Sequence, residues 1–381
     1  MEILPYFNAN SKPVAFVWYL LETSGDAPKC RVGHSACVVK PSNTEAPNNN
    51  GQLYLIGGAN PDNTFSDNPI LDLNSWQWGY KEFTGFMPRY EQSLFSTRNN
   101  SSSIYIFGGA NQTDTLNDIQ YLDTDANKWL TLTPKGDIPV PRTHHSTTSV
   151  DDQFVIFGGG AQGTSPVLDA KVHSFSVSTS TWFTLDIKGP APKPRLGHVS
   201  VSIDKKVYIH GGLCEDKFFD DFHVLDLETE SWQQLEVSGQ HPSARAAHGA
   251  VANGDNIYIF GGMSVDGALN DFYQVDTVSL ISTRIAVDAP APRPRLDFAM
   301  TITEITLDQP QSQKSGSDVE NLEPSEDPEE STEEELQASN GCESVENVEC
   351  SSRETYTVCL IHGGMDTEGG IFNDTLVIFL S

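Results

Sequence analysis

The strongest constraint on the fold is a repeated apolar strand that ends in two glycines. Stretches such as "LYLIGG" and "IYIFGG" occur six times along the chain. The second glycine of each pair stands at Gly58, Gly109, Gly159, Gly212, Gly262 and Gly364. The successive intervals are 51, 50, 53, 50 and 102 residues, so the last interval contains a large insertion. A period near 50 with this strand pattern is typical of the kelch repeat, one four-stranded blade of a β-propeller.

The remainder of each repeat fits the same blade. A third strand follows an Asn/Asp turn, as in "NDFYQVD", and a fourth strand often carries Trp, as in "TWFTL". A Pro-rich turn then leads to an Arg that opens the next blade, at Arg31, Arg89, Arg142, Arg195, Arg245 and Arg295. Thirteen residues before these arginines stand Trp18, Trp76, Trp129, Trp182, Trp232 and Ser282. Gly-Gly permits positive φ and close approach of a neighbouring segment, and Trp supplies a large buried area between blades.

The two ends of the chain each supply part of one blade. The sequence ends on a third strand, "NDTLVIF", whereas residues 16–21 form a fourth strand before the first repeat. We therefore predict that residues 1–381 form an all-β, six-bladed kelch β-propeller, closed by the N-terminal strand 16–21, which completes the last blade. The other strands of that blade are expected at about 295–303, 356–362 and 374–380. Closure pairs the two termini and removes open sheet edges.

An acidic insertion interrupts the last blade between its first and second strands. It covers residues 304–354, and from 308 to 354 it contains 15 acidic residues against Lys314 and Arg353. So polar a segment cannot bury enough surface to offset its conformational entropy, and we predict that it is disordered. It is either a solvated loop without a specific role or a regulatory, partner-binding arm. In the second case the candidate phosphorylation sites, each with an acidic residue three positions later, are Ser315, Ser317, Ser331 and Thr332.

Composition restricts the partners and the compartment. The chain has 23 Lys and Arg against 52 Asp and Glu, a formal net charge of −29, which disfavours nucleic acids and anionic lipid surfaces. No apolar stretch of about 18 residues is present, so we expect no membrane insertion, and the N-terminus does not have the pattern of a signal peptide. The six cysteines form no CxxC pair, which favours reduced thiols in the cytosol.

No motif points to catalysis. His34, His145, His198 and His248 lie three residues after four of the arginines, and this repetition predicts contacts between blades in place of a metal site. No HExxH, GxSxG or P-loop pattern occurs, and the Gly-Gly pairs lack the spacing of a nucleotide-binding loop. We therefore predict no catalytic residue, no metal and no cofactor.

The six arginines are predicted to surround one mouth of the central channel. Two interpretations stay open. Each Arg pins its own turn by pairing with a local carboxylate or carbonyl, or the six form a cationic mouth that binds carboxylates of a partner. The loops after Gly-Gly lie on the same face and differ between blades, as expected of a binding surface. Their candidate contact residues are Asn60, Phe65, Asn111, Phe218 and Phe219.

The ordered set of repeats resembles a known family. "GGANPDNTFSD", "FGGGAQGTSPVLDAKVHSF", "HGGLCEDKFFDDFHVLD" and "FGGMSVDGALNDFYQ", with the acidic insertion before the last repeat, resemble the kelch-repeat effectors of the late-endosomal small GTPase Rab-nine. The resemblance covers nearly the whole chain. It implies a non-enzymatic cytoplasmic protein that binds a GTP-bound Rab small GTPase and promotes vesicle transport from endosomes to the trans-Golgi network.

The same resemblance implies peripheral association with endosome and trans-Golgi network membranes and an endosomal phosphoinositide kinase as a second partner. It fixes no GTPase-contacting residues. We also expect a monomer. Two alternatives stay open. One is a kelch-type metal-dependent enzyme that uses the channel mouth. The other is a generic scaffold or ligase-substrate adaptor, which is weakened because no BTB-like or F-box-like helical segment precedes the propeller.

Overall fold

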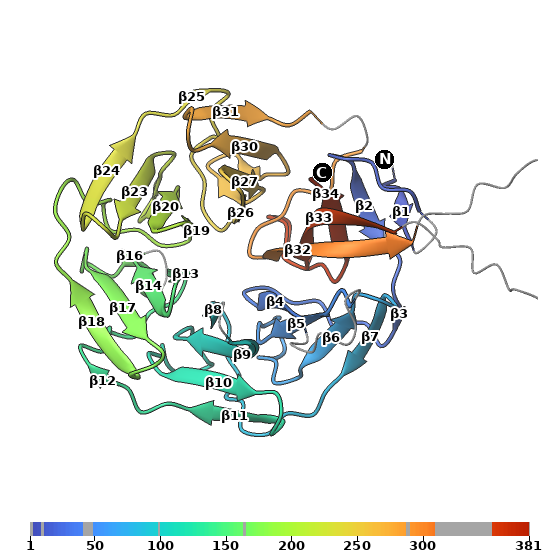
Figure 1. The fold of residues 1–381 in the computed structure, drawn as a ribbon, viewed down its shortest axis with the longest axis horizontal. Helices are drawn as coiled ribbons and strands as arrows, with labels where there is room; N and C mark the ends of the chain where they lie inside the picture. The colour runs from blue at the N-terminus through green and yellow to red at the C-terminus, as the bar shows by residue number, and fades with distance from the viewer. Residues whose placement is uncertain are drawn as a thin grey trace, which may run out of the picture.

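Six blades are arranged in a ring around a central axis (Figure 1). The computed structural model describes residues 3–8, 11–40, 49–97, 100–162, 165–286, 290–308 and 353–380. Within these ranges every regular element is a β-strand, and no helix is present that could cross a membrane. The prediction of an all-β, six-bladed propeller is confirmed.

Each blade is an antiparallel sheet whose four strands follow one another from the channel outwards. Blade 1 contains β4 (Ser35–Val39), β5 (Gln52–Ile56), β6 (Pro69–Asp72) and β7 (Gln77–Tyr80). Blade 2 contains β8 (Ser93–Thr97), β9 (Asn100–Phe107), β10 (Ile119–Asp123) and β11 (Lys128–Thr131). Blade 3 contains β13 (Ser146–Val150), β14 (Gln153–Phe157), β17 (Val172–Ser176) and β18 (Thr181–Leu185).

The second half of the ring follows the same plan. Blade 4 contains β19 (Val199–Ile203), β20 (Lys206–His210), β23 (Phe222–Asp226) and β24 (Ser231–Leu235). Blade 5 contains β26 (Gly249–Asn253), β27 (Asn256–Phe260), β30 (Phe272–Asp276) and β31 (Ile281–Arg284). Blade 6 contains β32 (Ala299–Asp308), β33 (Arg353–His362), β34 (Thr375–Phe379) and, from the N-terminus, β2 (Trp18–Leu21).

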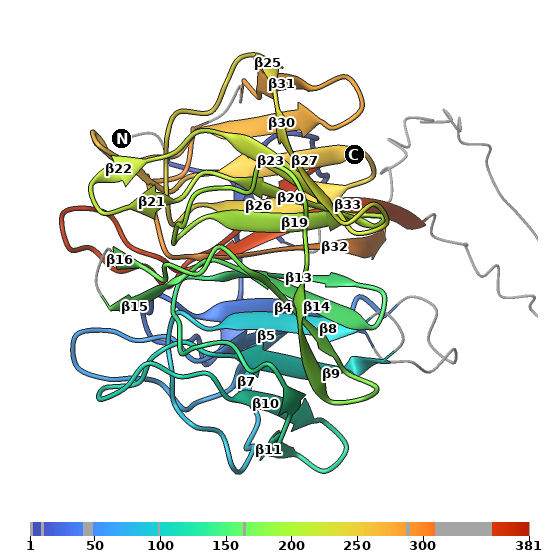
Figure 2. The same cartoon turned by 90° about the vertical axis from the view of Figure 1, so that its left-hand side faces the viewer.

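Short strands decorate this core. Parallel partners of an outer strand are β1 (Tyr6–Phe7), β3 (Ser24–Gly25), β12 (Lys135–Gly136) and β25 (Ser238–Gly239). Small hairpins between second and third strands are β15 (Gly160–Gln162) with β16 (Ser165–Pro166), β21 (Leu213–Cys214) with β22 (Lys217–Phe218), and β28 (Met263–Ser264) with β29 (Gly267–Ala268). We call the face that carries these hairpins the loop face. Figure 2 shows β15, β16, β21 and β22 together on this side.

The double glycines join each blade to the next. At Gly109 the N–H donates to the carbonyl of Arg142 at 3.0 Å, and a Cβ at the preceding Gly108 would lie 2.8 Å from that same oxygen. Both glycines have positive φ, so any other residue would introduce strain as well as a clash. The equivalent bond from Gly364 to the carbonyl of Arg31, at 3.2 Å, connects blade 6 to blade 1 and completes the circle.

The N-terminal strand completes the last blade, as predicted. β2 pairs antiparallel with β34, with Trp18 opposite Ile378. The indole of Trp18 is fully buried, and its ring centroid lies 4.8 Å from that of Phe260 and 5.5 Å from that of Phe272, both in blade 5. The strand therefore closes blade 6 through backbone pairing and fastens it to blade 5 through aromatic packing.

The thirteen-residue spacing from Trp to Arg is wrong for blade 1. Trp78 pairs with Leu71 in β6, as Trp129 pairs with Leu122 in blade 2, and so occupies the inter-blade position. Trp76 lies two residues earlier, at a turn position with φ of 54°. The segment between the outer strand and Arg89 is two residues shorter in this blade, and a count back from the arginine cannot detect that change.

The first two strands of blade 6 are longer than predicted. β32 and β33 pair continuously from Ala299 opposite His362 to Asp308 opposite Arg353. Residues 304–308 and 353–354 therefore belong to the blade and not to the insertion. The reason is that β32 and β33 continue to pair beyond the length of the inner strands in the other blades. The rest of the predicted disordered insertion, with Ser315, Ser317, Ser331 and Thr332, lies outside the described residues.

Candidate functional site

The six arginines lie on the loop face, each buried inside its own blade. Every one is essentially inaccessible to solvent. Arg195 is representative, since its guanidinium makes two bonds to the carboxylate of Asp221 and donates to the carbonyl of Gly211 at 2.9 Å. The partner carboxylates, each just before a third strand, are Asp67, Asp118, Asp169, Asp221, Asp271 and Asp374.

This geometry favours the structural interpretation of the arginines. Arg142 makes one bond to its aspartate, whereas the arginines of the other five blades make the planar, two-bond pairing. A guanidinium whose donors are occupied and whose surface is covered has no free edge for a partner. The predicted cationic mouth is therefore absent, and each Arg–Asp pair ties the entry of its blade to the turn before the third strand.

Aromatic residues that the sequence suggested as exposed contacts cover some of these pairs. The ring centroid of Phe65 lies 4.2 Å from the guanidinium carbon of Arg31. The ring centroid of Phe219 lies 4.3 Å from the guanidinium carbon of Arg195. Both rings are buried, which corrects the expectation that they face a partner. Phe218 is partly exposed and packs against a small cluster that includes Leu196 and Leu213.

The two asparagines of the predicted contact set shape their own loops. The side-chain oxygen of Asn60 accepts hydrogen bonds from the backbone N–H groups of Asp62 and Asn63. Asn111 does the same for Thr113 and Asp114, at 2.9 and 2.7 Å. These are Asx turns, in which the side chain replaces a backbone acceptor. Both residues thus hold the loops of the loop face in position.

The channel mouth on this face is bounded by a closed ring of backbone hydrogen bonds. The ring residue in each blade lies two positions after the arginine and has positive φ. Each donates its N–H to the carbonyl of the ring residue in the preceding blade, at 2.7–3.3 Å. In blade order the members are Gly33, Glu91, His144, Gly197, Ala247 and Asp297. Three of them have no functional side chain, so Glu91, His144 and Asp297 determine the chemistry of the mouth.

His144 connects two carboxylates across the channel mouth. Its Nδ1 lies 3.1 Å from Glu91 in the adjoining blade, and its Nε2 lies 3.5 Å from Asp297, which comes from the opposite blade of the ring. Burial alone would lower the pKa of His144. Hydrogen bonds to Asp297 and Glu91, with the charges of both carboxylates, outweigh burial and raise that pKa to about 10. The imidazolium form therefore persists at neutral pH and cross-links three blades.

Replacing His144 with glutamine is expected to lower the free energy of unfolding by about 1.5–3 kcal/mol at pH 6.5. Because the folded pKa lies above the unfolded value of 6.5, this stabilisation is complete below that value and disappears as pH rises through about 10. Thermal melts of wild type and variant from pH 6 to pH 10 measure the difference. His241→Gln is the control, since His241 contacts a backbone carbonyl. A melting difference that does not change with pH would contradict this assignment.

The four repeated histidines lie deeper and contact neighbouring blades. His145 is buried, its Nε2 lies 2.7 Å from the hydroxyl of Ser93, and its Cε1 would lie 3.0 Å from a Cβ at Gly108. Burial is the main cause that lowers the pKa of His34, His145, His198 and His248, so they are neutral at pH 7. Among the residues that the structure describes, no group of three or more potential metal ligands is present.

A groove of about 340 Å³ adjoins the mouth between blades 2 and 3. Glu91 and His144 form its inner end, and the Asn111–Thr115 loop and Ala161 form its outer walls. The Thr115 hydroxyl donates to the carbonyl of Ala161 and so connects the loops of the two blades. The groove and the mouth share the same two charged side chains, which the sequence interpretation missed. Comparing the six blades two positions after each arginine could have identified them.

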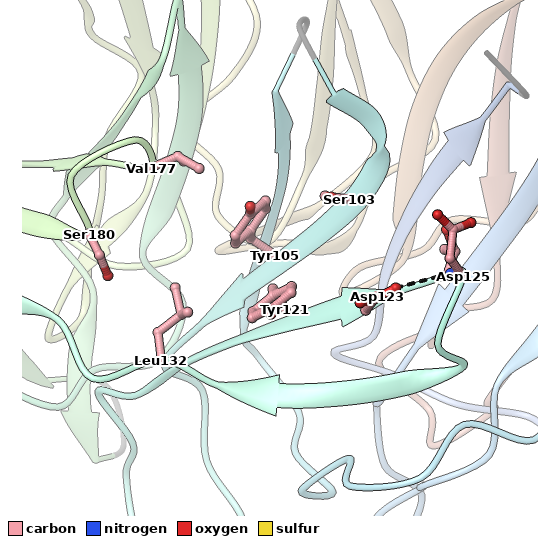
Figure 3. A pocket seen from close by; sticks show the side chains of 9 residues that line it. Ser103, Tyr105, Tyr121, Asp123, Asp125, Leu132, Val177 and Ser180 are labelled. Carbon is pink, nitrogen blue, oxygen red and sulfur yellow. Dashed lines mark hydrogen bonds between the residues drawn. The ribbon is translucent and has the colours of Figure 1, made fainter.

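A second concavity lies between the same two blades on the opposite face (Figure 3). It has a volume of about 460 Å³, and its lining includes Tyr105, Tyr121 and Val177. The carboxylate of Asp123, which also lines this cavity, accepts hydrogen bonds from the backbone N–H groups of Asp125 and Ala126. Asp123 therefore stabilises a turn.

Comparisons with known proteins agree with this architecture. The sequence profile described as the FBX42 β-propeller domain matches residues 89–277. The protein named "Acyl-CoA-binding domain-containing protein 4" from Arabidopsis thaliana is 32% identical over 234 residues, which cover 58% of this chain and 33% of that protein.

Two more similar relatives carry one name. "Rab9 effector protein with kelch motifs" from Bos taurus is 40% identical over 222 residues, which cover 58% of this chain and only 59% of the bovine protein. The protein of the same name from Rattus norvegicus is 40% identical over 383 residues, which cover 99% of both chains. With 40% identity over nearly the entire length of both chains, this chain belongs to the family of Rab9 effector proteins with kelch motifs.

Proposed function

We propose that this protein is a non-enzymatic effector that binds a Rab small GTPase in its GTP-bound state. The observation that carries the proposal is the end-to-end similarity to relatives whose printed name is that of Rab9 effectors. The structure adds a rigid support. Arg–Asp pairs and Asx turns hold loops of different sequence on one face, which is how repeat scaffolds present binding surfaces.

The proposal includes a cellular role and a location. The protein would act in vesicle transport from endosomes to the trans-Golgi network, from the cytoplasm and by peripheral association with those membranes. It would bind as a monomer, with an endosomal phosphoinositide kinase as a second partner. The formal net charge of −29 fits recruitment through a protein partner better than direct binding to anionic lipid.

Nucleotide-dependent binding tests this function. We expect the purified full chain to retain a Rab9-type GTPase loaded with a non-hydrolysable GTP analogue at least tenfold better than the same GTPase loaded with GDP. The reason is that an effector must contact segments whose conformation depends on the γ-phosphate. Equal retention of both forms, or of neither, would exclude the effector role. Metal analysis of the same preparation tests the alternative of a kelch-type metal-dependent enzyme, because bound metal in stoichiometric amount would support that alternative.

A further inference from the structure

Blades 2 and 3 carry exposed apolar side chains on the loop face. The exposed fractions are 43% for Met87, 46% for Ile138, 50% for Val140 and 87% for Leu168. We call these four residues the apolar strip. Large exposed apolar side chains gathered at one place cost solubility and commonly mark an interaction site.

The repeat itself shows that the scaffold does not require these residues. The position two residues before the arginine is Lys29, Met87, Val140, Lys193, Ser243 and Arg293 in the six blades. The position just before the paired aspartate is Ser66, Asn117, Leu168, Asp220, Asn270 and Asn373. At both positions the other blades fold with polar or charged residues. The apolar exceptions occur only in blades 2 and 3, which are neighbours in the ring.

Hydrogen bonds link the backbone of the strip on the blade 2 side. Arg89 donates from Nε to the carbonyl of Met87 at 3.1 Å and binds Asp118 with both terminal nitrogens. The residue before this aspartate, Asn117, donates to the carbonyl of Pro139 at 3.0 Å. Pro139 stands between Ile138 and Val140, so these bonds place Met87 in one connected framework with both residues.

The blade 3 side is held in the same way. Arg142 donates from Nε to the carbonyl of Val140 at 3.1 Å and from its terminal nitrogen to Asp169 at 3.2 Å. Leu168 precedes this aspartate in the chain. The backbone of the strip is therefore held in place in two neighbouring blades, which reduces the entropy lost when a partner binds.

Acidic groups lie beside the strip and in the groove between the same two blades. Asp137 is exposed beside Ile138, Asp114 is exposed in the wall of the groove, and Glu91 lies at the inner end of that groove. An apolar centre with a carboxylate rim complements a partner segment that presents apolar side chains flanked by Lys or Arg.

We infer that the apolar strip and the groove between the same two blades form the docking surface for the switch segments of the GTP-loaded GTPase. This inference rests on the proposed function. A protein that distinguishes GTP from GDP must bind the segments ordered by the γ-phosphate, since a ligand with equal affinity for two states cannot discriminate between them. The strip supplies the central apolar contacts, and the carboxylates of Asp114 and Asp137 orient the partner's basic residues.

The test replaces the strip with residues that the other blades already use. The triple variant Met87→Ser, Val140→Lys and Leu168→Asn is expected to fold, because each new residue occupies the same position elsewhere in the ring. We expect its Kd for the GTPase loaded with a GTP analogue to rise at least tenfold, and its melting temperature to stay within about 2 °C of wild type. Val265→Ser is the matched control, since Val265 is 78% exposed on the β28–β29 hairpin of blade 5.

The possible results separate the two proposals. If wild type binds the GTP-loaded form and the triple variant binds equally well, the docking surface lies elsewhere and the inference is wrong. Equal loss in the Val265→Ser control would contradict the location in blades 2 and 3. If wild type does not bind at all, the proposed function itself fails. Neutralising the rim with Asp114→Asn and Asp137→Asn should slow association at low salt, and an unchanged rate would overturn the charge contribution.

Discussion

Replacing Trp18 with alanine is expected to lower the free energy of unfolding by about 3–5 kcal/mol, the usual loss when a buried Trp is truncated in a core. The side chain is fully buried between blades 5 and 6, against Phe260 and Phe272. The substitution leaves a cavity at the junction where the two ends of the chain meet. It therefore weakens both the packing of the closing strand and the contact between neighbouring blades.

Thermal and urea unfolding of the full chain measure this loss. Tyr6→Ala is the matched control, because Tyr6 is also an aromatic residue of the N-terminal segment but is 59% exposed. We expect the control to change the melting temperature by about 1 °C or less and Trp18→Ala to lower it by several degrees. A Trp18→Ala variant that melts with the control would show that the N-terminal strand does not close the ring.

Replacing Arg245 with methionine is expected to cost about 3–5 kcal/mol, because it leaves a buried carboxylate without its counter-charge. Asp271 has a side chain that is only 13% exposed, and both of its oxygens accept bonds from this guanidinium. The carbonyl of Gly261 also loses a donor. The methylene chain of methionine keeps much of the volume, so the loss reports the charge and the hydrogen bonds.

Two further variants make this expectation specific. The double variant Arg245→Met with Asp271→Leu removes both charges and should recover part of the lost stability, since the buried unpaired carboxylate is gone. Lys205→Met is the control, because Lys205 pairs with Asp151 at 3.6 Å on the open surface and should contribute less than about 1 kcal/mol. If urea unfolding shows that Arg245→Met lowers the free energy of unfolding no more than Lys205→Met, the buried arginines do not stabilise the blades.

Much of the candidate site could not be predicted, because repetition does not reveal exposure. The sequence predicted that the six arginines and the loops after Gly-Gly lie on one face. It could not determine that Phe65 covers Arg31 or that each arginine meets an aspartate of its own blade. Those contacts connect residues 34 or more positions apart in the first blade, and their geometry depends on how the loop folds back.

The mouth of the channel illustrates the same limit. Glu91, His144 and Asp297 are separated by more than 50 residues in sequence, and only closure of the ring brings them together. No sequence motif singles out these three residues. The apolar strip is similar, since Met87 and Val140 become noticeable only when the equivalent positions of the other blades are superimposed. An interpretation based on the repeat emphasises what the blades share, and it therefore overlooks the residues that differ from one blade to another.

By itself, the sequence determined the number of blades, their order and the joining of the two termini, because each blade repeats the same local requirements. These are an apolar strand, two glycines, an Asn/Asp turn and an Arg before the next inner strand. The tertiary structure decided which charges are buried, which tryptophan stands in the outer strand of blade 1, and which residues face solvent on the loop face. Local pattern sets strand formation, whereas burial and pairing depend on segments that closure brings into contact from distant parts of the chain.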